Sequence, residues 1–499
     1  MSGLKKLANQ TLIYGGTTII GRLLNYLLVP FHTYVFLDPR KYGVVGEMYA
    51  WVALLMVLLT YGMETAFFRF SNAENDKSKV FSSSFWTLFS TTSLFLILTL
   101  VFAQPLANIM QYASHPEYIR WFAIIVSFDV VSSIPFARLR AENRPLRFAF
   151  IKIFNIGVSV FFNLFFLWFC PLMIRHGIGV PFFSLIYHPE VGVGYIFIAN
   201  LIASALQMLL LLTTCKGLKF KIDFSLIKPM LKYALPLLIL GLAGIVNETL
   251  DRILIKNLSS DNLDIAMHNL GVYSACFKIA VIMSLFIQAF RYSAEPFFFS
   301  KFKEKDAKET YATVMTYFVI VCSLIFLATT LYLDFVKYFV SKPYHEGLRI
   351  VPIVLLAYLM LGIVFNLSIW YKLNGQTKYG AYISIGGAAI TLIINFSLIP
   401  VMGYIGAAWA HFITYFCMMI ASYWLGQKFF PIKYDLKKMG FYSVTAVALF
   451  ALSYFVIPFQ KFGTHSLMIK TIFNTFLLLF YIFIIYKKEF KTLKKSIKN

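Results

Sequence analysis

Residues 269–297 read NLGVYSACFKIAVIMSLFIQAFRYSAEPF, and this stretch decides the class of fold. It is apolar over more than the roughly 20 residues that an α-helix needs to cross the ~30 Å hydrocarbon core of a bilayer. Three charged residues nevertheless interrupt it, namely Lys278, Arg291 and Glu295. Because charges are costly in lipid, the stretch predicts a membrane span whose charged residues need a water-filled cavity or a partner.

Similar apolar runs recur along the whole chain. Of its 499 residues, 59% are hydrophobic and only 13% are charged, whereas a soluble protein carries about 25% charge. These values exclude a soluble enzyme, a disulfide scaffold and a disordered chain. We predict an all-α integral membrane protein with 14 transmembrane helices. Their approximate bounds are 11–35, 43–67, 81–105, 117–137, 147–173, 191–214, 231–255, 269–297, 310–337, 348–371, 379–400, 404–426, 439–458 and 466–486.

The basic residues predict the orientation of these spans. About two-thirds of the 45 lysines and arginines fall in the N-terminal tail, in alternate loops and in the C-terminal tail. Loops rich in lysine and arginine stay in the cytoplasm, so both termini are expected there. The longest external loop, 174–190, is too short for a catalytic domain.

An internal repeat divides the spans into two sets of six. Four matches share an offset of about 230 residues: Gly43-Val44 with Gly271-Val272, Glu64 with Glu295, Asn143 with Asn374, and Asn163 with Asn395. Six spans are an even number, so the two repeats enter the membrane in the same direction. We predict an N-lobe at 1–225, a C-lobe at 226–430, and two extra helices with a basic tail at 431–499.

Polar residues inside the spans are the candidate functional residues, because each buried charge costs about 2.5–3.5 kcal/mol in lipid. The candidates for an anion-binding cavity are Arg22, Asn25, Lys152, Arg252, Lys278 and Arg291. Those for gating or coupling are Glu64, Asp129 and Glu295, and those for a cation site are Asn247, Asp251 and Asn395. We expect no catalytic residue.

Some of these charges have structural alternatives. Glu248 with Arg252 and Arg291 with Glu295 are i,i+4 pairs that could neutralise each other. Glu47, near the external interface, is expected to reach out to the membrane surface. The sequence contains no GxxxxGK[ST] loop for ATP. We therefore expect no cofactor other than a coupling ion, Na⁺ or H⁺.

Several motifs resemble those of a known family. They are Gly21-Arg22-Leu23-Leu24 with Pro30 and Tyr42-Gly43, then Leu250-Asp251-Arg252-Ile253-Leu254, Leu270-Gly271-Val272-Tyr273-Ser274 and Glu295-Pro296, and finally Leu373-Asn374-Gly375 and Pro400–Ala408. The chain resembles the polysaccharide repeat-unit flippases of the multidrug/oligosaccharidyl-lipid/polysaccharide exporter superfamily. Spans 13 and 14 fit its fourteen-span members.

The resemblance implies a V-shaped pair of lobes that works by alternating access in the cytoplasmic (inner) membrane of a bacterium. The implied substrate is an undecaprenyl-pyrophosphate-linked oligosaccharide, moved to the outer leaflet for O-antigen, capsule or exopolysaccharide assembly. Membrane lipids and a polymerase and chain-length regulator of the same pathway are the implied partners; nucleic acid is not expected.

Three alternatives remain open. Lipid II flippases share the fold but typically carry several arginines in spans 1 and 2, where this sequence has only Arg22 before Arg69. A drug or cation antiporter would have an acidic, aromatic cavity, against which Arg22 and Lys278 argue. A polysaccharide polymerase or glycosyltransferase would need a larger external domain.

Overall fold

The computed structural model describes residues 2–74, 76–302, 304–456 and 466–498. Within these ranges the secondary structure is helical, without a strand, which confirms the all-α prediction. Thirteen helices of the described chain are long and apolar enough to cross a membrane, and they match the expected spans 2–14. The expected span 11–35 lies within α1 (Ser2–Val35), one continuous helix of 34 residues. The last two residues of the expected span 439–458 lie outside the described residues.

The chain divides into two compact units, Met1–Gly271 and Val272–Asn499. The helices of the first unit are α1, α2 (Pro39–Thr60), α3 (Met63–Ala73), α4 (Lys77–Val101), α5 (Ala103–Ile109), α6 (Pro116–Ala141), α7 (Pro145–Leu164), α8 (Cys170–Arg175), α9 (Val180–Ile186), α10 (Gly194–Leu212) and α11 (Phe224–Leu258). The chain passes to the second unit within α12 (Leu263–Lys301). The helices that follow are α13 (Ala307–Leu331), α14 (Leu333–Val336), α15 (Val351–Leu367), α16 (Ile369–Leu373), α17 (Thr377–Met402), α18 (Tyr404–Phe429), α19 (Leu436–Ala451) and α20 (Ser466–Lys498).

The boundary between the units differs from the expected lobe boundary at 225/226. The physical reason is the packing of α11, which contacts α2, α3 and α4 of the first unit. Met230 and Ala234 of α11 are fully buried in the same apolar cluster as Phe67 of α3 and Phe81 of α4.

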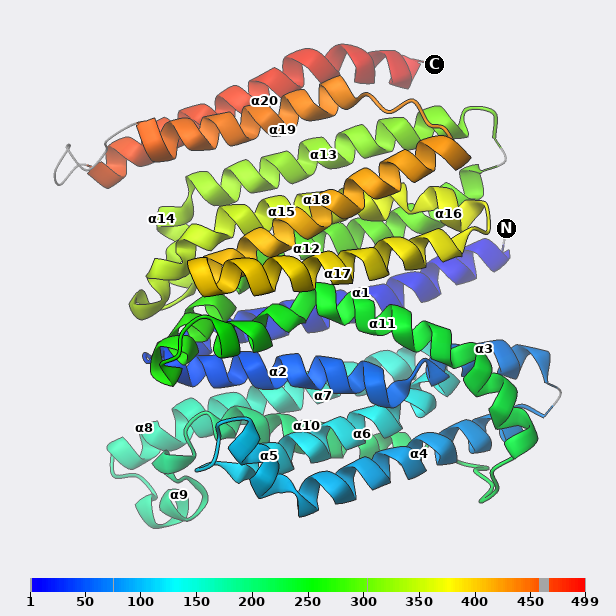
Figure 1. The fold of residues 1–499 in the computed structure, drawn as a ribbon, viewed down its shortest axis with the longest axis vertical. Helices are drawn as coiled ribbons and strands as arrows, with labels where there is room; N and C mark the ends of the chain where they lie inside the picture. Colours follow the sequence, from blue (N-terminus) through cyan, green and yellow to red (C-terminus); the bar gives the residue numbers. More distant parts are fainter. Residues whose placement is uncertain (1, 75, 303, 457–465, 499) are drawn as a thin grey trace. The chain divides into compact units, whose positions relative to one another are not determined.

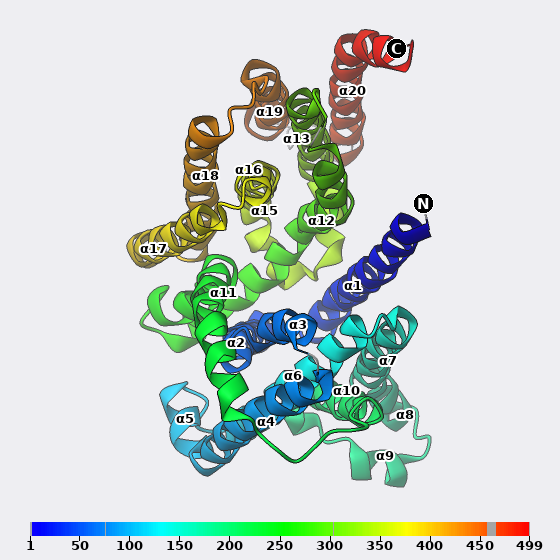
Figure 2. The same cartoon turned by 90° about the vertical axis from the view of Figure 1, so that its right-hand side faces the viewer.

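The internal repeat is confirmed by the order in which helices contact one another within each unit. In the first unit α7 packs on α10, α10 on α6, and α6 on α4. In the second unit α17 packs on α18, α18 on α15, and α15 on α13. The helices of the first series are spans 5, 6, 4 and 3, and those of the second series are spans 11, 12, 10 and 9. Corresponding spans of the two repeats therefore pack in the same order. Figure 1 shows α17 beside α18, and Figure 2 views the helices from the side turned by 90°.

The two appended helices, α19 and α20, pack on each other and on α13 within the second unit. A buried Glu489 on α20 accepts hydrogen bonds from the Tyr442 hydroxyl (2.6 Å) and the Lys438 ammonium group (2.7 Å), both on α19. This charged contact helps to fix the register of α19 against α20.

Aspartates set where several helices begin. The carboxylates of Asp38, Asp76, Asp223 and Asp435 accept backbone N–H groups at the starts of α2, α4, α11 and α19. These N–H groups have no partner within the helix, so a capping carboxylate satisfies them and complements the helix dipole. Each cap lies at a junction between loop and span.

Glycines decide two other features of the first unit. Tyr61 and Gly62 have positive φ angles (33° and 73°) and separate α2 from α3, so the second span is broken just before Glu64. At the opposite end of α2, Gly43 lies against Gly271 of α12, with which it is paired in the repeat. Helix backbones can approach this closely only where both residues lack a side chain.

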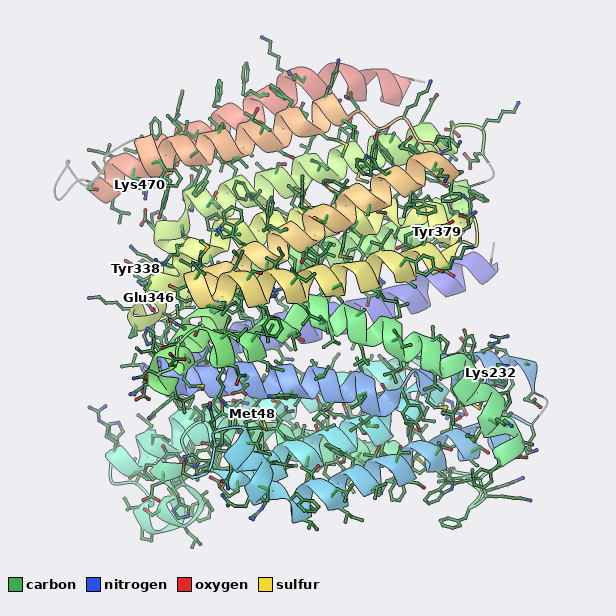
Figure 3. All side chains as sticks on the ribbon, in the orientation of Figure 1. Met48, Lys232, Tyr338, Glu346, Tyr379 and Lys470 are labelled. Carbon is green, nitrogen blue, oxygen red and sulfur yellow. The ribbon has the colours of Figure 1, made fainter. Side chains whose placement is uncertain are left out.

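The two ends of the second unit carry different loops. In Figure 3 the labelled side chains of Tyr338, Glu346 and Lys470 lie at one end of its helices and Tyr379 lies at the other. This division agrees with the topology predicted from the sequence, which places the loop before Tyr379 in the cytoplasm, Tyr338 and Glu346 in an external loop, and Lys470 near the outer end of the last span. We call the end of the second unit that carries Tyr379 its basic end. In the first unit, the end that carries Arg140 is likewise called the basic end.

Candidate functional site

A polar cluster lies among the helices of the first unit. Asp129 on α6 accepts a hydrogen bond from Gln207 on α10 at 3.4 Å, and Lys152 on α7 lies within electrostatic range of Asp129. The Lys152 ammonium group also lies 4.2 Å from the ring centroid of Phe136. Lys152 and Asp129 were both expected to be functional from the sequence, and the structure brings them together.

The same unit holds an ion pair at its basic end. Glu64, at the start of α3, pairs with Arg140 in the last turn of α6. Their side chains are 39% and 33% exposed, so water reaches the pair. Lys152 lies within electrostatic range of both residues. The helix break at Gly62 places Glu64 where α6 ends, and this connects the polar cluster to the basic end.

A second charged group lies at the basic end of the second unit. Glu295 on α12 pairs with Arg291, one turn earlier, at 3.2 Å and with Lys372 on α16 at 2.5 Å. The three side chains line a small pocket between α12, α15 and α16. The expected i,i+4 pair Arg291–Glu295 is therefore confirmed, and Lys372 adds a second cation to it.

The two charged groups correspond through the repeat. Glu64 and Glu295 are matched at an offset of about 230 residues, and each pairs with a base at the end of the span two further along the chain. Sequence reasoning missed the partners, Arg140 and Lys372, because both had been counted as ordinary loop cations. Arg140 lies close in sequence to Asn143, and Lys372 lies close to Asn374, the residue matched to Asn143 in the repeat. This correspondence could have identified both partners.

The cavity candidates Arg22 and Asn25 are exposed on α1 of the first unit. Neighbouring apolar residues share this exposure, and Leu23 is 44% exposed. In the second unit, Lys278 is half-buried, whereas the other residues of 271–280 are buried. Both cations thus interrupt otherwise apolar helices.

Three further candidates lie together on α11. Asn247, Asp251 and Arg252 are buried, and Arg252 donates to the Asp251 carboxylate at 3.2 Å. The alternative in which Arg252 pairs with the carboxylate of Glu248 is not observed: Arg252 donates to the backbone carbonyl of Glu248 at 3.0 Å, and the Glu248 side chain is exposed. Burial requires a close partner for Arg252, and the Asp251 carboxylate supplies it.

Asn395, the third residue of the expected cation site, belongs to α17 of the second unit and is 1% exposed. Its amide nitrogen donates to the Thr391 carbonyl at 2.8 Å. Its Oδ1 atom has no hydrogen-bond partner within the described part of the chain. A carbonyl oxygen in this position can accept a hydrogen bond or bind a hard cation.

Glu47 differs from its expected position at the membrane surface. It is 2% exposed, and Lys256 of α11 pairs with it at 2.9 Å. The Tyr112 hydroxyl donates to the same carboxylate at 2.5 Å, and Lys256 also donates to the Met110 carbonyl at 2.5 Å. Burial and the Glu47 charge raise the pKa of Tyr112 well above its usual range, which keeps its hydroxyl a donor. The contact ties α11 to α2 and to the loop before α6.

Comparisons with known proteins define the family. Residues 7–302, more than half of the chain, match the profile of the family described as "Polysaccharide biosynthesis protein". A search of curated proteins found no match.

Solved structures define the fold. The structure titled "Lipid II flippase MurJ, inward closed conformation" is similar at a TM-score of 0.67 and 15% identity, over 96% of this chain and 99% of that one. An inward-facing multidrug resistance MATE family transporter of the MOP superfamily matches at a TM-score of 0.65 and 14% identity, over 81% and 93% of the two chains.

The fold is shared with a flippase and a transporter of known structure, and thirteen helices of the described chain are apolar enough to cross a membrane, as in a multi-pass membrane protein. The chain belongs to the polysaccharide biosynthesis protein family.

Proposed function

We propose that this protein moves undecaprenyl-pyrophosphate-linked oligosaccharide repeat units from the cytoplasmic to the outer leaflet of a bacterial inner membrane, by alternating access. Both termini then lie in the cytoplasm, and a polymerase and a chain-length regulator would use the product. The substrate's sugars and pyrophosphate cannot cross hydrocarbon alone, because each unpaired polar group costs several kcal/mol there.

The observation that carries the proposal is Arg22, an arginine exposed on an apolar membrane helix. Facing lipid it would cost about 2.5–3.5 kcal/mol, whereas facing a hydrated cavity it would attract an anionic head group. Lys152, on α7 of the same unit, is a further cation within a membrane helix, near Asp129.

Transport in liposomes tests this function. A fluorescent polyprenyl-pyrophosphate oligosaccharide is added to liposomes containing the purified protein, and its exposure to an external quencher is followed. We expect wild-type protein to expose the lipid, Arg22→Ala to lower the rate at least tenfold, and Arg22→Lys to keep part of it. Leu23→Ala, the exposed neighbour, is the matched control and should transport normally.

The same liposome assay distinguishes the proposed function from the lipid II and polymerase alternatives. Transport of lipid II but not of the oligosaccharide would contradict the proposed substrate and assign the wall-precursor function instead. A new glycosidic linkage without transport would favour the polymerase alternative.

The coupling ion is proposed to be Na⁺ or H⁺, with Asn247 and Asp251 on α11 of the first unit as its ligands. Their side-chain oxygens are the ligands that hard cations prefer. In the transport assay, a sodium gradient should accelerate wild-type protein, and Asp251→Asn should remove the acceleration. Equal sodium dependence in both proteins would contradict this site.

The two matched ion pairs are proposed to control access from the cytoplasm, with Glu64 and Glu295 as gating residues. Glu64→Gln is expected to slow transport several-fold while changing the free energy of unfolding by less than about 1 kcal/mol, because the pair is partly exposed. Exchanging the charges, Glu64→Arg with Arg140→Glu, should restore transport in part. Lys301→Gln breaks another exposed ion pair, with Glu304, and is the control; an equal loss in that variant would contradict a gating role.

A further inference from the structure

We propose that a pocket at the end of the second unit opposite its basic end binds the phosphate group of a membrane phospholipid, and that it prefers an anionic head group. The pocket lies between α13, α14, α19 and α20 and has a volume of about 190 Å³. Because α19 and α20 are the two appended helices, the site depends on the part of the chain that lies outside the repeat. It goes beyond the proposed function, since it does not involve the transported substrate.

The pocket lies at the level where a membrane span ends. The span α13 ends at Leu331, and Asp334, three residues later, lines the pocket. Two tyrosines at this level, Tyr338 and Tyr454, are more than half exposed. In Figure 3 the labelled side chains of Tyr338 and Lys470 lie at the same end of the unit. Exposed tyrosines at the end of a span are typical of the membrane–water interface, where lipid head groups lie.

The charged side chains among the described residues that line the pocket favour an anion. Asp334 pairs with Lys470 at 2.7 Å through Oδ2 and with Lys337 at 3.5 Å through Oδ1. Two cations therefore share one carboxylate, which leaves a net positive charge. An ammonium group has three N–H donors, so each lysine can also donate to a phosphate oxygen. All three side chains are between 28% and 30% exposed, which leaves them accessible to a ligand.

The size and walls of the pocket suit a lipid phosphate. Its volume of about 190 Å³ is more than ten times the ~10–15 Å³ that one water molecule needs, so a partly hydrated phosphate group fits. The side chains of Leu333, Phe450 and Tyr454 line the pocket beside the charged residues. Charged groups next to apolar walls match the region of a phospholipid where the phosphate joins the glycerol and the acyl chains.

Buried hydrogen bonds hold the walls of the pocket together. Asn474 on α20 donates to the Leu331 carbonyl at the end of α13 at 2.6 Å, and it accepts from the Ser453 hydroxyl at 2.6 Å. Ser453 belongs to a π-helical turn, Leu452–Val456, that follows α19. Such turns are rare and frequently lie at functional sites. The contacts fix α13, α19 and α20 around the pocket, so a ligand has little to order when it binds.

Lipid binding to the full-length protein in detergent is measured by native mass spectrometry. The probes are two lipids with the same short acyl chains, anionic phosphatidylglycerol and zwitterionic phosphatidylcholine. Inorganic phosphate is added as a competitor, because a free phosphate ion offers the same charged oxygens without the lipid. We expect the wild-type protein to bind phosphatidylglycerol several-fold more tightly than phosphatidylcholine, and inorganic phosphate to compete weakly.

The variants change the charge of the pocket in opposite directions. Lys337→Gln with Lys470→Gln removes both cations and should weaken phosphatidylglycerol binding at least about tenfold. Asp334→Asn keeps both cations and removes the competing carboxylate, so it should bind phosphatidylglycerol about two- to fivefold more tightly. Lys342→Gln with Arg349→Gln is the charge-matched control, because both are exposed cations of the 342–350 turn that do not line the pocket. Without lipid, all variants should melt close to the wild type, since these groups are partly exposed.

The outcomes are distinct. Weaker binding by the double lysine variant together with tighter binding by Asp334→Asn supports the site, because both variants break the ion pairs and only the charge differs. Strong competition by inorganic phosphate, with the same dependence on the two lysines, supports the anion site and assigns it to soluble phosphate. Equal binding of the two lipids by the wild type, unchanged binding by the double lysine variant, or an equal loss in the charge-matched control or in Asp334→Asn overturns the proposal.

Discussion

Lys256→Met is expected to lower the free energy of unfolding by about 3–5 kcal/mol, because it leaves the buried carboxylate of Glu47 without its cation. The side chains of Lys256 and Glu47 are only 2% and 3% exposed, so water cannot replace the lost partner. Two neutral donors, the Tyr112 hydroxyl and the Trp51 indole N–H, would then face the charge. Thermal and SDS-induced unfolding of the purified protein measure the loss.

The double variant Glu47→Leu with Lys256→Met is the matched control. Removing both charges leaves no unpaired ion, so most of the lost stability should return. Arg40→Gln breaks an exposed ion pair with Asp264 in the same unit and should change stability by less than about 1 kcal/mol. A small effect of Lys256→Met, or a double variant as unstable as the single one, would show that the pair does not hold α11 to α2.

The second large effect is expected for Gly271→Ala. A β-carbon at Gly271 would collide with the carbonyl oxygen of Pro39 and lie 2.6 Å from its carbonyl carbon. These are backbone atoms at the first residue of α2, so neither helix can yield by turning a side chain. Such overpacking costs about 1–3 kcal/mol or more, and we expect a lower melting temperature and a lower yield of folded protein.

Gly244→Ala provides the comparison, because a β-carbon on this helical glycine would meet no atom within 4 Å. Alanine favours the helix by up to about 1 kcal/mol over glycine, so this variant should be as stable as the wild type or slightly more stable. Gly43→Ala should behave like Gly271→Ala, since its β-carbon would lie 2.5 Å from the Met267 carbonyl oxygen. If Gly271→Ala is as stable as Gly244→Ala, the close approach of α2 and α12 is not needed for folding.

The sequence predicts those candidate residues whose charged side chains lie within apolar spans. Glu64, Asp129 and Glu295 were identified because an ionised group in an apolar span is costly unless a partner or a hydrated cavity stabilises it. Their partners Arg140 and Lys372 were missed, since a cation in a loop is ordinary until a fold brings an acid to it.

The opposite error concerned Glu47. A carboxylate near a span end can reach water, and the sequence favoured that outcome. Lys256, which buries and pairs it, lies on a different helix more than 200 residues later. Only the packing of α11 on α2 makes the pair possible.

The sequence by itself determined the helical membrane class, the positions of the spans and the internal repeat. These follow from local properties, namely the length of apolar runs and the near-identity of residues at a constant offset. The tertiary structure alone decided the ion-pair partners, the contact of Gly43 with Gly271, the membership of α11 in the first unit and the pocket around Asp334. Those features depend on how each helix is rotated about its axis, and neighbouring helices fix that rotation through contacts between residues far apart in the chain.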